Sequence, residues 1–441
     1  MRRILSPHAY SDAPIADCFW ADSVPLPDCA PLAGDKVADV AIIGAGFTGL
    51  SAAFRLAEAG RDVVVLDAKQ PGWGASGRNG GFCCIGGSKA SDTALTARVG
   101  SEGCRDYRLA ERDAVLFVSD LIDRLGLDVD RHSKGETLLA HRRRDFEAMK
   151  REAAGVETLY GVAPELIEAR DLPAHGMAGS FHGAMTTPIG FALNPRKYLV
   201  GLLTAAQNAG ACVHGNTGVT SVTRTGASFA LLTEHGTVTA GQVIVATNGY
   251  SAEDIPNWMS ARVLPAQSSV LVTRPITPAE QEQQGWTSQQ MAYDSRRLLH
   301  YFRLMPDGRF LFGMRGGIRT NASADHRAHA RTRADFERMF PAWRHIGAPW
   351  HWSGFVALSR DLTPFAASVP DQPGLHAAFA YHGNGVAMGS YSGALVADTV
   401  LGRSELRYPE VMKAPPGRFP FGSLRRVALA PAYLAYGLAD L

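Results

Sequence analysis

The stretch Val40-Ala-Ile-Ile-Gly44-Ala-Gly46-Phe-Thr-Gly49-Leu50, followed further on by Asp67, decides the fold of this chain. The apolar run 37–43 predicts a strand that is buried on both faces. The first glycine permits a sharp turn, the second lets the backbone approach a pyrophosphate, and the third lets a helix pack closely on the strand. A second strand, 63–66, delivers Asp67, whose carboxylate can accept hydrogen bonds from both ribose hydroxyls. The pattern predicts a Rossmann-type dinucleotide site.

A glycine-rich loop comes next, with the sequence Gly72-Trp-Gly74-Ala75-Ser76-Gly77-Arg78-Asn79-Gly80-Gly81. Five glycines in ten residues leave much of this backbone uncovered. The N–H groups and the single guanidinium of such a loop can bind a diphosphate or the polar edge of a flavin. The loop therefore predicts further cofactor contacts, and an ordinary flexible loop is the alternative.

The segment 74–81, placed after a Rossmann unit, resembles the D-amino-acid-oxidase-like flavoproteins, and among them the γ-glutamylputrescine oxidase branch. Residues 241–250, 300–313 and 352–386 follow in the family's order, and the tail 419–438 is also similar to that branch. The resemblance implies FAD as the cofactor. It also implies an α/β fold, with a Rossmann-type FAD-binding domain and an interleaved α+β substrate domain built on a mostly antiparallel sheet.

The expected FAD-binding domain is discontinuous. It takes residues 1–88, 187–250 and 351–441, and its first 36 residues are a proline-rich lead-in. The substrate-binding domain takes residues 89–186 and 251–350. Such interleaving places the active site between the two domains, facing the flavin ring.

A second glycine pair, Gly383 and Gly385, lies between an apolar strand, 377–381, and a helix that begins near Val386. A helix N-terminus at this point would stabilise the negative charge of a reduced flavin. The rival interpretation is a second dinucleotide site, for NAD(P)H, but no apolar strand that carries an acid follows. The resemblance further implies that the backbone of Val219 meets the adenine edge. The predicted cofactor-binding residues are Gly44, Gly46, Phe47, Thr48, Gly49, Asp67, Ala68, Gly74, Ala75, Ser76, Arg78, Asn79, Gly80, Gly81, Val219, Thr247, Gly249, Gly383, Asn384, Gly385 and Val386.

Four departures from the family pattern bear on the cofactor and the substrate. Relatives that tether FAD use a histidine in the loop that here holds Ser76 and Arg78, or a late cysteine, and this chain has no cysteine after Cys212. We therefore expect non-covalent FAD. Three positions differ on the substrate side: Val356 replaces a carboxylate-binding arginine, Leu311 a lysine implicated in oxygen activation, and Asn384 a frequent histidine. These differences disfavour small α-amino acids as substrates and leave the electron acceptor open.

The resemblance predicts an FAD-dependent amine oxidoreductase. A neutral amine, γ-glutamylputrescine or a related compound, gives a hydride to flavin N5; the imine hydrolyses to an aldehyde or keto product, and O2 or another acceptor reoxidises the flavin. Alternatives are an amino acid or a 2-hydroxy acid as substrate, or a flavoprotein subunit that needs a partner chain. Strand alternation puts Tyr301 and Arg303 on one face and His300 on the other, and either face can meet the flavin. The substrate-side candidates are Tyr301, Arg303, His300 and His382, with Tyr250 as a weaker one.

Composition narrows the remaining classes. The chain has 441 residues, enough for two or three domains, and a formal charge of +2, which indicates neither nucleic acid nor an anionic membrane as a partner. The six cysteines have no C-x-x-C spacing, so we expect no metal site and no disulfide framework. Neither a signal peptide nor a membrane-spanning run is evident, and we expect a cytoplasmic protein.

Overall fold

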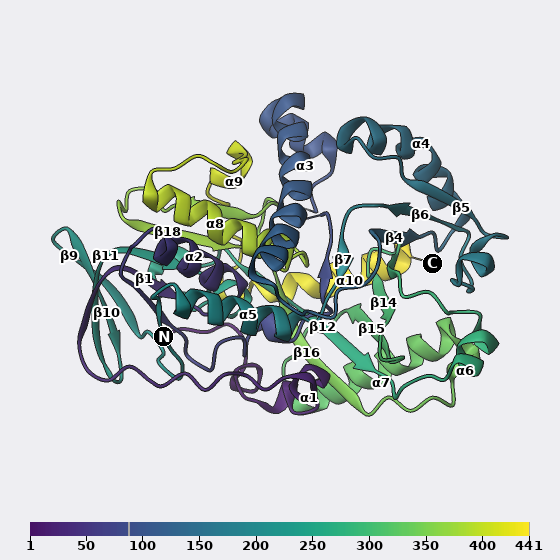
Figure 1. Ribbon diagram of the computed structural model, residues 1–441, viewed down its shortest axis with the longest axis horizontal. Helices are drawn as coiled ribbons and strands as arrows, with labels where there is room; N and C mark the ends of the chain where they lie inside the picture. Colours follow the sequence, from purple (N-terminus) through teal and green to yellow (C-terminus); the bar gives the residue numbers. More distant parts are fainter. Residues whose placement is uncertain (87–88, 441) are drawn as a thin grey trace.

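Two eight-stranded sheets organise the computed structural model, which describes residues 1–86 and 89–440. The first sheet occupies one half of the molecule and the second sheet the other half (Figure 1). The chain passes back and forth between them, so that each sheet contains strands from distant parts of the sequence. The α/β fold with an interleaved second domain is therefore confirmed.

The first sheet is built around β1, which pairs in parallel with β2 on one side and with β11 on the other. Residues 40–43 are buried because both faces of this strand are covered, and this explains the unbroken apolar run. The strand order is β17-β18-β11-β1-β2-β8, and β10 and β9 extend antiparallel from β11. The strands are β1 Lys36–Ile43, β2 Val63–Leu66, β8 Cys212–His214, β9 Ser221–Thr225, β10 Ser228–Thr233, β11 Gly236–Val245, β17 Phe365–Ser368 and β18 Leu375–Phe379.

A helical layer packs on this sheet. The helices α2 (Phe47–Glu58), α5 (Pro195–Asn208) and α8 (Ala387–Leu401) contact one another and share one hydrophobic core. The long α3 (Asp92–Leu125), kinked at Gly100, joins the same core through Tyr107 and Val118. We expected residues 89–186 in the substrate domain, so the placement of α3 on the FAD-side layer is a correction.

The second sheet has the order β16-β12-β15-β14-β13-β4-β6-β5 and is antiparallel except where β13 pairs with β4. Its edge strand β16 begins at residue 350, so the expected domain boundary at 351 is wrong: the chain returns to the first sheet only with β17. The strands are β4 Glu136–Leu139, β5 Glu165–Glu168, β6 Gly183–Thr187, β12 Leu264–Val272, β13 Met291–Asp294, β14 His300–Leu304, β15 Phe310–Arg315 and β16 Trp350–Leu358.

An aromatic core fixes α7 (Ala322–Met339) against the second sheet. Phe302 and Phe310 project from the sheet into a cluster with Phe336, Phe340 and Trp343. The face of β14 that carries Phe302 is therefore used for packing, and the opposite face is left for other contacts. The remaining elements are α1 Phe19–Ser23, α4 Arg143–Tyr160, α6 Pro278–Gln284, α9 Glu410–Lys413, α10 Leu429–Ala439, a short pair β3 Phe82–Cys83 and β7 Phe191–Ala192, and the 3-10 helices η1 Pro7–Tyr10, η2 Ala13–Ile15, η3 Ala75–Gly77, η4 Leu172–His175, η5 Asn248–Tyr250, η6 Asn257–Met259, η7 Pro341–Trp343 and η8 Gly422–Ala428.

Candidate active site

The turn from β1 into α2 has the geometry that its glycines predict. Gly44 has φ +106°, and a Cβ there would lie 2.9 Å from the carbonyl oxygen of Ala246. A Cβ on Gly46 would lie 2.7 Å from Ser76 Oγ, and one on Gly49 would lie 1.9 Å from the Gly44 carbonyl oxygen. A side chain at Gly44 or Gly49 would clash with backbone, and one at Gly46 would displace the Ser76 hydroxyl, so the turn leaves bare backbone at the N-terminus of α2.

Asp67 lies at the end of β2, beside this turn. Its carboxylate accepts hydrogen bonds from the N–H groups of Ala45 (2.7 Å) and Lys69 (2.9 Å). Burial raises the pKa of Asp67 to about 6. The acid is thus held at the position that the βαβ pattern predicts, and its contact with a ribose stays a prediction.

A single cavity of about 450 Å³ connects the glycine turn to the second sheet. Most of the predicted cofactor residues line it. Gly49, Gly81 and Gly249 do not; Gly49 acts through helix packing, and Gly81 lies against the carbonyl oxygen of Leu193. Those that line the cavity are Gly44, Gly46, Phe47, Thr48, Asp67, Ala68, Gly74, Ala75, Ser76, Arg78, Asn79, Gly80, Val219, Thr247, Gly383, Asn384, Gly385 and Val386.

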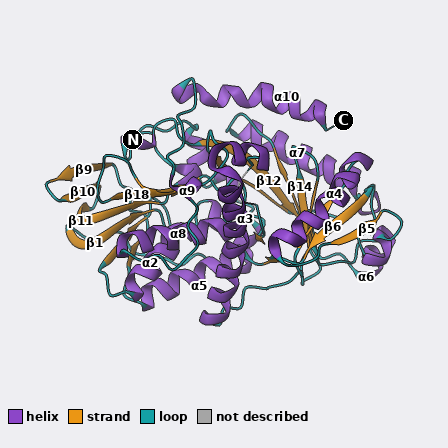
Figure 2. Cartoon of the chain, turned by 90° about the horizontal axis from the view of Figure 1, so that it is seen from above, coloured by secondary structure: helices purple, strands orange, loops and turns teal. Residues whose placement is uncertain are grey.

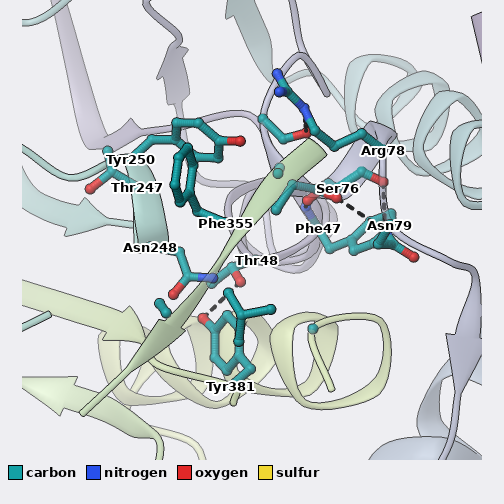
Figure 3. A pocket seen from close by; sticks show the side chains of 18 of the residues that line it. Phe47, Thr48, Ser76, Arg78, Asn79, Thr247, Asn248, Tyr250, Phe355 and Tyr381 are labelled. Atoms are coloured by element: carbon teal, nitrogen blue, oxygen red, sulfur yellow. Dashed lines mark hydrogen bonds between the residues drawn. The ribbon is translucent and has the colours of Figure 1, made fainter. Parts of the chain in front are cut away.

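The glycine-rich loop is tied to the N-terminus of α2 (Figure 3). Ser76 Oγ accepts a hydrogen bond from the N–H of Phe47 (3.0 Å). The side chain of Asn79 donates to the carbonyl oxygen of Ser76 (2.9 Å) and accepts from the N–H of Gly81 (2.8 Å). The loop is consequently ordered by its own side chains, and the flexible-loop alternative does not describe it.

Arg78 has a structural role that we did not expect. Its guanidinium donates to the carbonyl oxygens of Trp73, Gly74 and Ser353, and it packs over the Trp73 ring at 4.4 Å. The side chain lines the cavity, but its donors hold the loop to β16. A contact between the remaining N–H groups of Arg78 and a diphosphate or the polar edge of a flavin stays a prediction.

The late glycines lie where β18 meets α8. Gly383 has φ +111°, and Asn384 anchors the turn by donating to the carbonyl oxygen of Cys84 (2.6 Å). Figure 3 shows the hydroxyl of Tyr381 beside Thr48, with an oxygen–oxygen distance of 2.8 Å, which links this turn to α2. The N-termini of α2 and α8 thus converge on one cavity, as expected for a site that binds an anionic cofactor.

The strand 300–304 presents only one of its predicted residues to the cavity. Tyr301 lines it, and its hydroxyl lies 2.9 Å from Ser268 Oγ. Arg303 is on the same face but is completely buried further along the strand, where it donates to the carbonyl oxygen of Leu193 (2.8 Å). His300 is on the opposite face, between Asp294 and Asp335. Arg303 and His300 are therefore corrected from substrate-side to structural residues.

His382 and Tyr250 also line the cavity, as expected. His382 has φ +54°, and its Nε2 accepts a hydrogen bond from the N–H of Ser359 (3.2 Å). Its carbonyl oxygen accepts from Arg315 Nη2 (2.7 Å). His382 is thus held by both its ring and its backbone, and a role in catalysis stays a prediction.

Two cations that we did not predict lie at the substrate end of the cavity. Arg315 follows Gly313 on β15, and Gly313 pairs with Tyr301, so strand alternation puts Arg315 on the cavity face. Lys89, an exposed residue, also lines the cavity, and the charge of Arg315 lowers the pKa of its ammonium to about 8. Val356 lines the cavity too. Although no arginine stands at 356, Arg315 and Lys89 supply the site with cations.

A buried acid was also missed. Tyr293 lines the cavity and donates its hydroxyl hydrogen to Glu136 Oε1 (2.6 Å), and Glu136 Oε2 accepts from the N–H of Ile85 (2.8 Å). Burial raises the pKa of Glu136 to about 7. The pairing of β4 with β13 brings these two residues together from positions 157 apart in sequence, a proximity that no local pattern indicates.

The residues around the glycine turn fit a dinucleotide, because bare backbone and two helix N-termini line one end of the cavity while aromatic and charged side chains line the other. The fold and this site define a dinucleotide-binding protein with an α/β fold. The model of the family described as FAD dependent oxidoreductase (DAO) matches residues 39–399, and the chain belongs to that family. FAD is its cofactor.

Relatives match over almost the whole chain. A probable oxidoreductase OrdL of Rhizobium meliloti is 31% identical over 92% of this chain and 93% of its own length. The gamma-glutamylputrescine oxidoreductase of Escherichia coli is 27% identical over 91% of this chain and 92% of its own length, which supports the expected resemblance. The crystal structure of glycine oxidase from Geobacillus kaustophilus superposes with a TM-score of 0.70, at 21% identity, over 86% of this chain and 98% of that chain.

Among the described residues, no helix combines the length and apolarity that crossing a bilayer requires.

Proposed function

We propose that the protein oxidises the C–N bond of an amine that also carries a carboxylate. The main observation behind this proposal is that Arg315 and Lys89 line the cavity that extends from the glycine turn between β1 and α2. A carboxylate desolvated between two cations is stabilised, whereas the same group without a cation would cost several kcal/mol. FAD, when bound, supplies the two-electron acceptor for this oxidation.

The residues of the chain have separate tasks in this proposal. Arg315 and Lys89 bind the carboxylate and so fix the amine end relative to the cofactor. The hydroxyl of Tyr293 accepts a proton from the substrate ammonium while its own proton passes to Glu136 Oε1. A carboxylate with a pKa of about 7 is suited to that transfer near neutral pH, and the amine must lose its proton before its carbon can be oxidised.

The identity of the substrate changes in one respect from our expectation. We expected small α-amino acids to be poor substrates because Val356 replaces the family's arginine, and Arg315 removes that reason. γ-Glutamylputrescine stays our preferred type of substrate, because it combines an oxidisable terminal amine with a distal carboxylate and because the gamma-glutamylputrescine oxidoreductase is similar over most of its length. A small α-amino acid is the second candidate, since its carboxylate also suits Arg315.

Anaerobic stopped-flow reduction of the flavin tests the proposal. The panel is γ-glutamylputrescine, putrescine, glycine, D-alanine and a 2-hydroxy acid, each tried on the wild type, Arg315→Met and Arg315→Lys. We expect carboxylated amines to reduce the flavin faster than putrescine. We also expect Arg315→Met to weaken their binding about 10- to 100-fold, with partial recovery in Arg315→Lys.

Other outcomes select the alternatives. Reduction by the 2-hydroxy acid alone would replace the amine with an alcohol substrate. Reduction by putrescine that equals reduction by γ-glutamylputrescine, unchanged in Arg315→Met, would remove the carboxylate from the proposal. A flavin that no compound reduces would favour a subunit that needs a partner chain.

A further inference from the structure

The C-terminal segment 421–438 presents an unusual surface. Among the described residues, six of the thirteen exposed large apolar side chains belong to it. Phe421 is 73% exposed, Leu434 68% and Leu438 64%; Leu424, Val427 and Tyr436 complete the set. Such a concentration in eighteen residues differs from the scattered apolar exposure of ordinary surfaces, and in α10 Leu434 and Leu438, four residues apart, lie on one face. We call these six side chains the C-terminal apolar strip.

The two charged residues of this segment, Arg425 and Arg426, contact the body of the protein, and so does Asp440 just beyond it. Arg425 is buried, donating to Glu253 Oε1 (2.5 Å) and to the carbonyl oxygen of Val263 (2.6 Å). Arg426 packs over the ring of Phe355, and Asp440 accepts from the N–H groups of Arg297 (2.8 Å) and Leu298 (3.0 Å). A helix that only faced water would have the reverse arrangement.

Both ends of the strip are attached to the body of the protein. The buried Arg425–Glu253 pair holds η8 to the FAD-side half. At the other end, Arg142 donates to the carbonyl oxygen of Ala439, and the Asp440 contacts add to this attachment. Figure 2 shows α10 along the outer edge of the molecule, with no other element outside it. The apolar strip is therefore a fixed platform and not a frayed end.

Exposed arginines flank the strip at both ends. At the η8 end, the exposed Arg3 lies 4.0 Å above the Tyr10 ring, which packs in the cluster of Phe355; Arg426, which also packs on Phe355, is half-buried. At the α10 end, the Arg297 guanidinium lies 5.7 Å from the centre of the Tyr436 ring. Arg143 and Arg144, both exposed, follow the anchor Arg142. An apolar strip between two groups of cations is complementary to a surface that is apolar inside and anionic outside.

We propose that the C-terminal apolar strip docks the protein on an anionic phospholipid bilayer, with α10 lying in the plane of the interface. At 11 residues, α10 is roughly 16 Å long, so it lies on a bilayer and does not cross it. A second copy of the chain fits less well. Pairing two strips along their length, in either direction, sets one group of arginines against another.

This inference revises one expectation from composition. The formal charge of +2 for the whole chain gave no indication of an anionic membrane. The relevant quantity is the local distribution, because charge is screened over about 8–10 Å at physiological salt. Docking on a bilayer does not involve the substrate, so its test is independent of the amine oxidation proposed above.

The test is vesicle flotation of the FAD-loaded full chain. One vesicle type is phosphatidylcholine alone, and the other contains added phosphatidylglycerol. We expect the wild type to float with the anionic vesicles and high salt to weaken the binding. The double variant Leu434→Glu/Leu438→Glu should lower the partition coefficient about tenfold for each leucine, as expected when a buried apolar side chain is lost. The matched control is Val37→Glu, which changes a valine that is 75% exposed on β1, outside the strip, and should float like the wild type.

A second variant separates charge from apolar contact. Arg143→Gln/Arg144→Gln should reduce binding to anionic vesicles and leave the weak binding to neutral vesicles unchanged. Flavin absorbance and the Tm of each variant establish that it is folded. The proposal is overturned if the wild type does not float, or if the double glutamate variant floats as well as the wild type. It is also overturned if light scattering shows a dimer that Leu434→Glu dissociates while neither protein binds vesicles.

Discussion

At the residue scale, Asp67 offers the most direct test of the cofactor site. The change Asp67→Ala removes the acceptor at the end of β2 and the two backbone contacts that fix the turn. We expect FAD affinity to fall about 10- to 100-fold, since a hydrogen bond to a charged group is worth roughly 1.5–3 kcal/mol. Fluorescence titration of apoprotein with FAD measures this. Asp67→Glu is the control and should retain much more affinity; full occupancy of Asp67→Ala at low FAD concentration would contradict our placement of the ribose.

Titration of Lys89 should make the affinity for a carboxylated inhibitor decrease as the pH rises. Because the pKa of Lys89 is lowered to about 8, the ammonium is charged below pH 8 and neutral above it. Binding of a carboxylate favours the charged form of Lys89, so below pH 8 the affinity for a carboxylated inhibitor should change only with Glu136, whose pKa is about 7. The affinity should then fall, by up to about tenfold per unit, as pH rises through 8. Equilibrium titration of the flavin spectrum between pH 6 and pH 10 provides the measurement.

Lys89→Met is the matched control for this dependence. Its inhibitor affinity should be lower at pH 7 and should lack the decrease centred on pH 8, because Arg315 remains charged throughout. A pH profile in Lys89→Met that is identical to that of the wild type would assign the titration to another group.

The sequence indicates some site residues and hides others for physical reasons. Tyr301 was found because strand alternation limits a side chain to two faces. The same rule failed for Arg303, because residues on one face still differ in how far along the strand they lie, and the cavity ends before it. Arg315 could have been found by extending the alternation from Gly313, the partner of Tyr301. Lys89 and Glu136 could not, since only the tertiary fold brings them to the cavity.

At the element scale, the close packing of α2 on β1 depends on Gly49, which has no side chain. In Gly49→Ala the new Cβ would lie 1.9 Å from the Gly44 carbonyl oxygen, so the helix must move away from the turn. We expect loss of FAD binding and a Tm several degrees lower, since overpacking costs typically 1–3 kcal/mol. Differential scanning fluorimetry with and without FAD measures both effects.

Gly155→Ala in α4 is the comparison for that experiment. A Cβ there meets nothing within 4 Å, and alanine favours a helix by up to about 1 kcal/mol. The Tm should rise slightly, with FAD binding unchanged. If Gly49→Ala behaves like Gly155→Ala, then close helix–strand packing is not what the third glycine provides.

Elements with strong local signals were predicted well, and their assignment to layers was not. The strands β1, β2, β14 and β18 were expected within a few residues of their observed bounds. The apolar face of α3 indicates that the helix packs on a sheet, but it does not indicate which sheet. Its contact with α8, almost 300 residues away in sequence, has no local signature.

At the scale of the whole molecule, the protein should be yellow and should release its flavin as FAD on acid or heat denaturation. The reason is that the cavity holds Ser76 and Arg78 where tethering relatives have histidine, and β16 contributes no cysteine beside Trp352. Chromatography of the supernatant after acid precipitation identifies the flavin. Colour that remains with the precipitated polypeptide would contradict non-covalent binding and would direct attention to Cys84, which lines the cavity.

Because β1 pairs in parallel with β11, the first sheet can form only after much of the chain has been synthesised. β1 leaves the ribosome early, but Lys36 pairs with Val238, which is translated 202 residues later. β11 in turn waits for β18, so the sheet is complete only after residue 379 has emerged. The nascent chain therefore carries an apolar strand with an open edge through most of its translation. That edge is where premature aggregation would begin and where a ribosome-associated chaperone would be needed first.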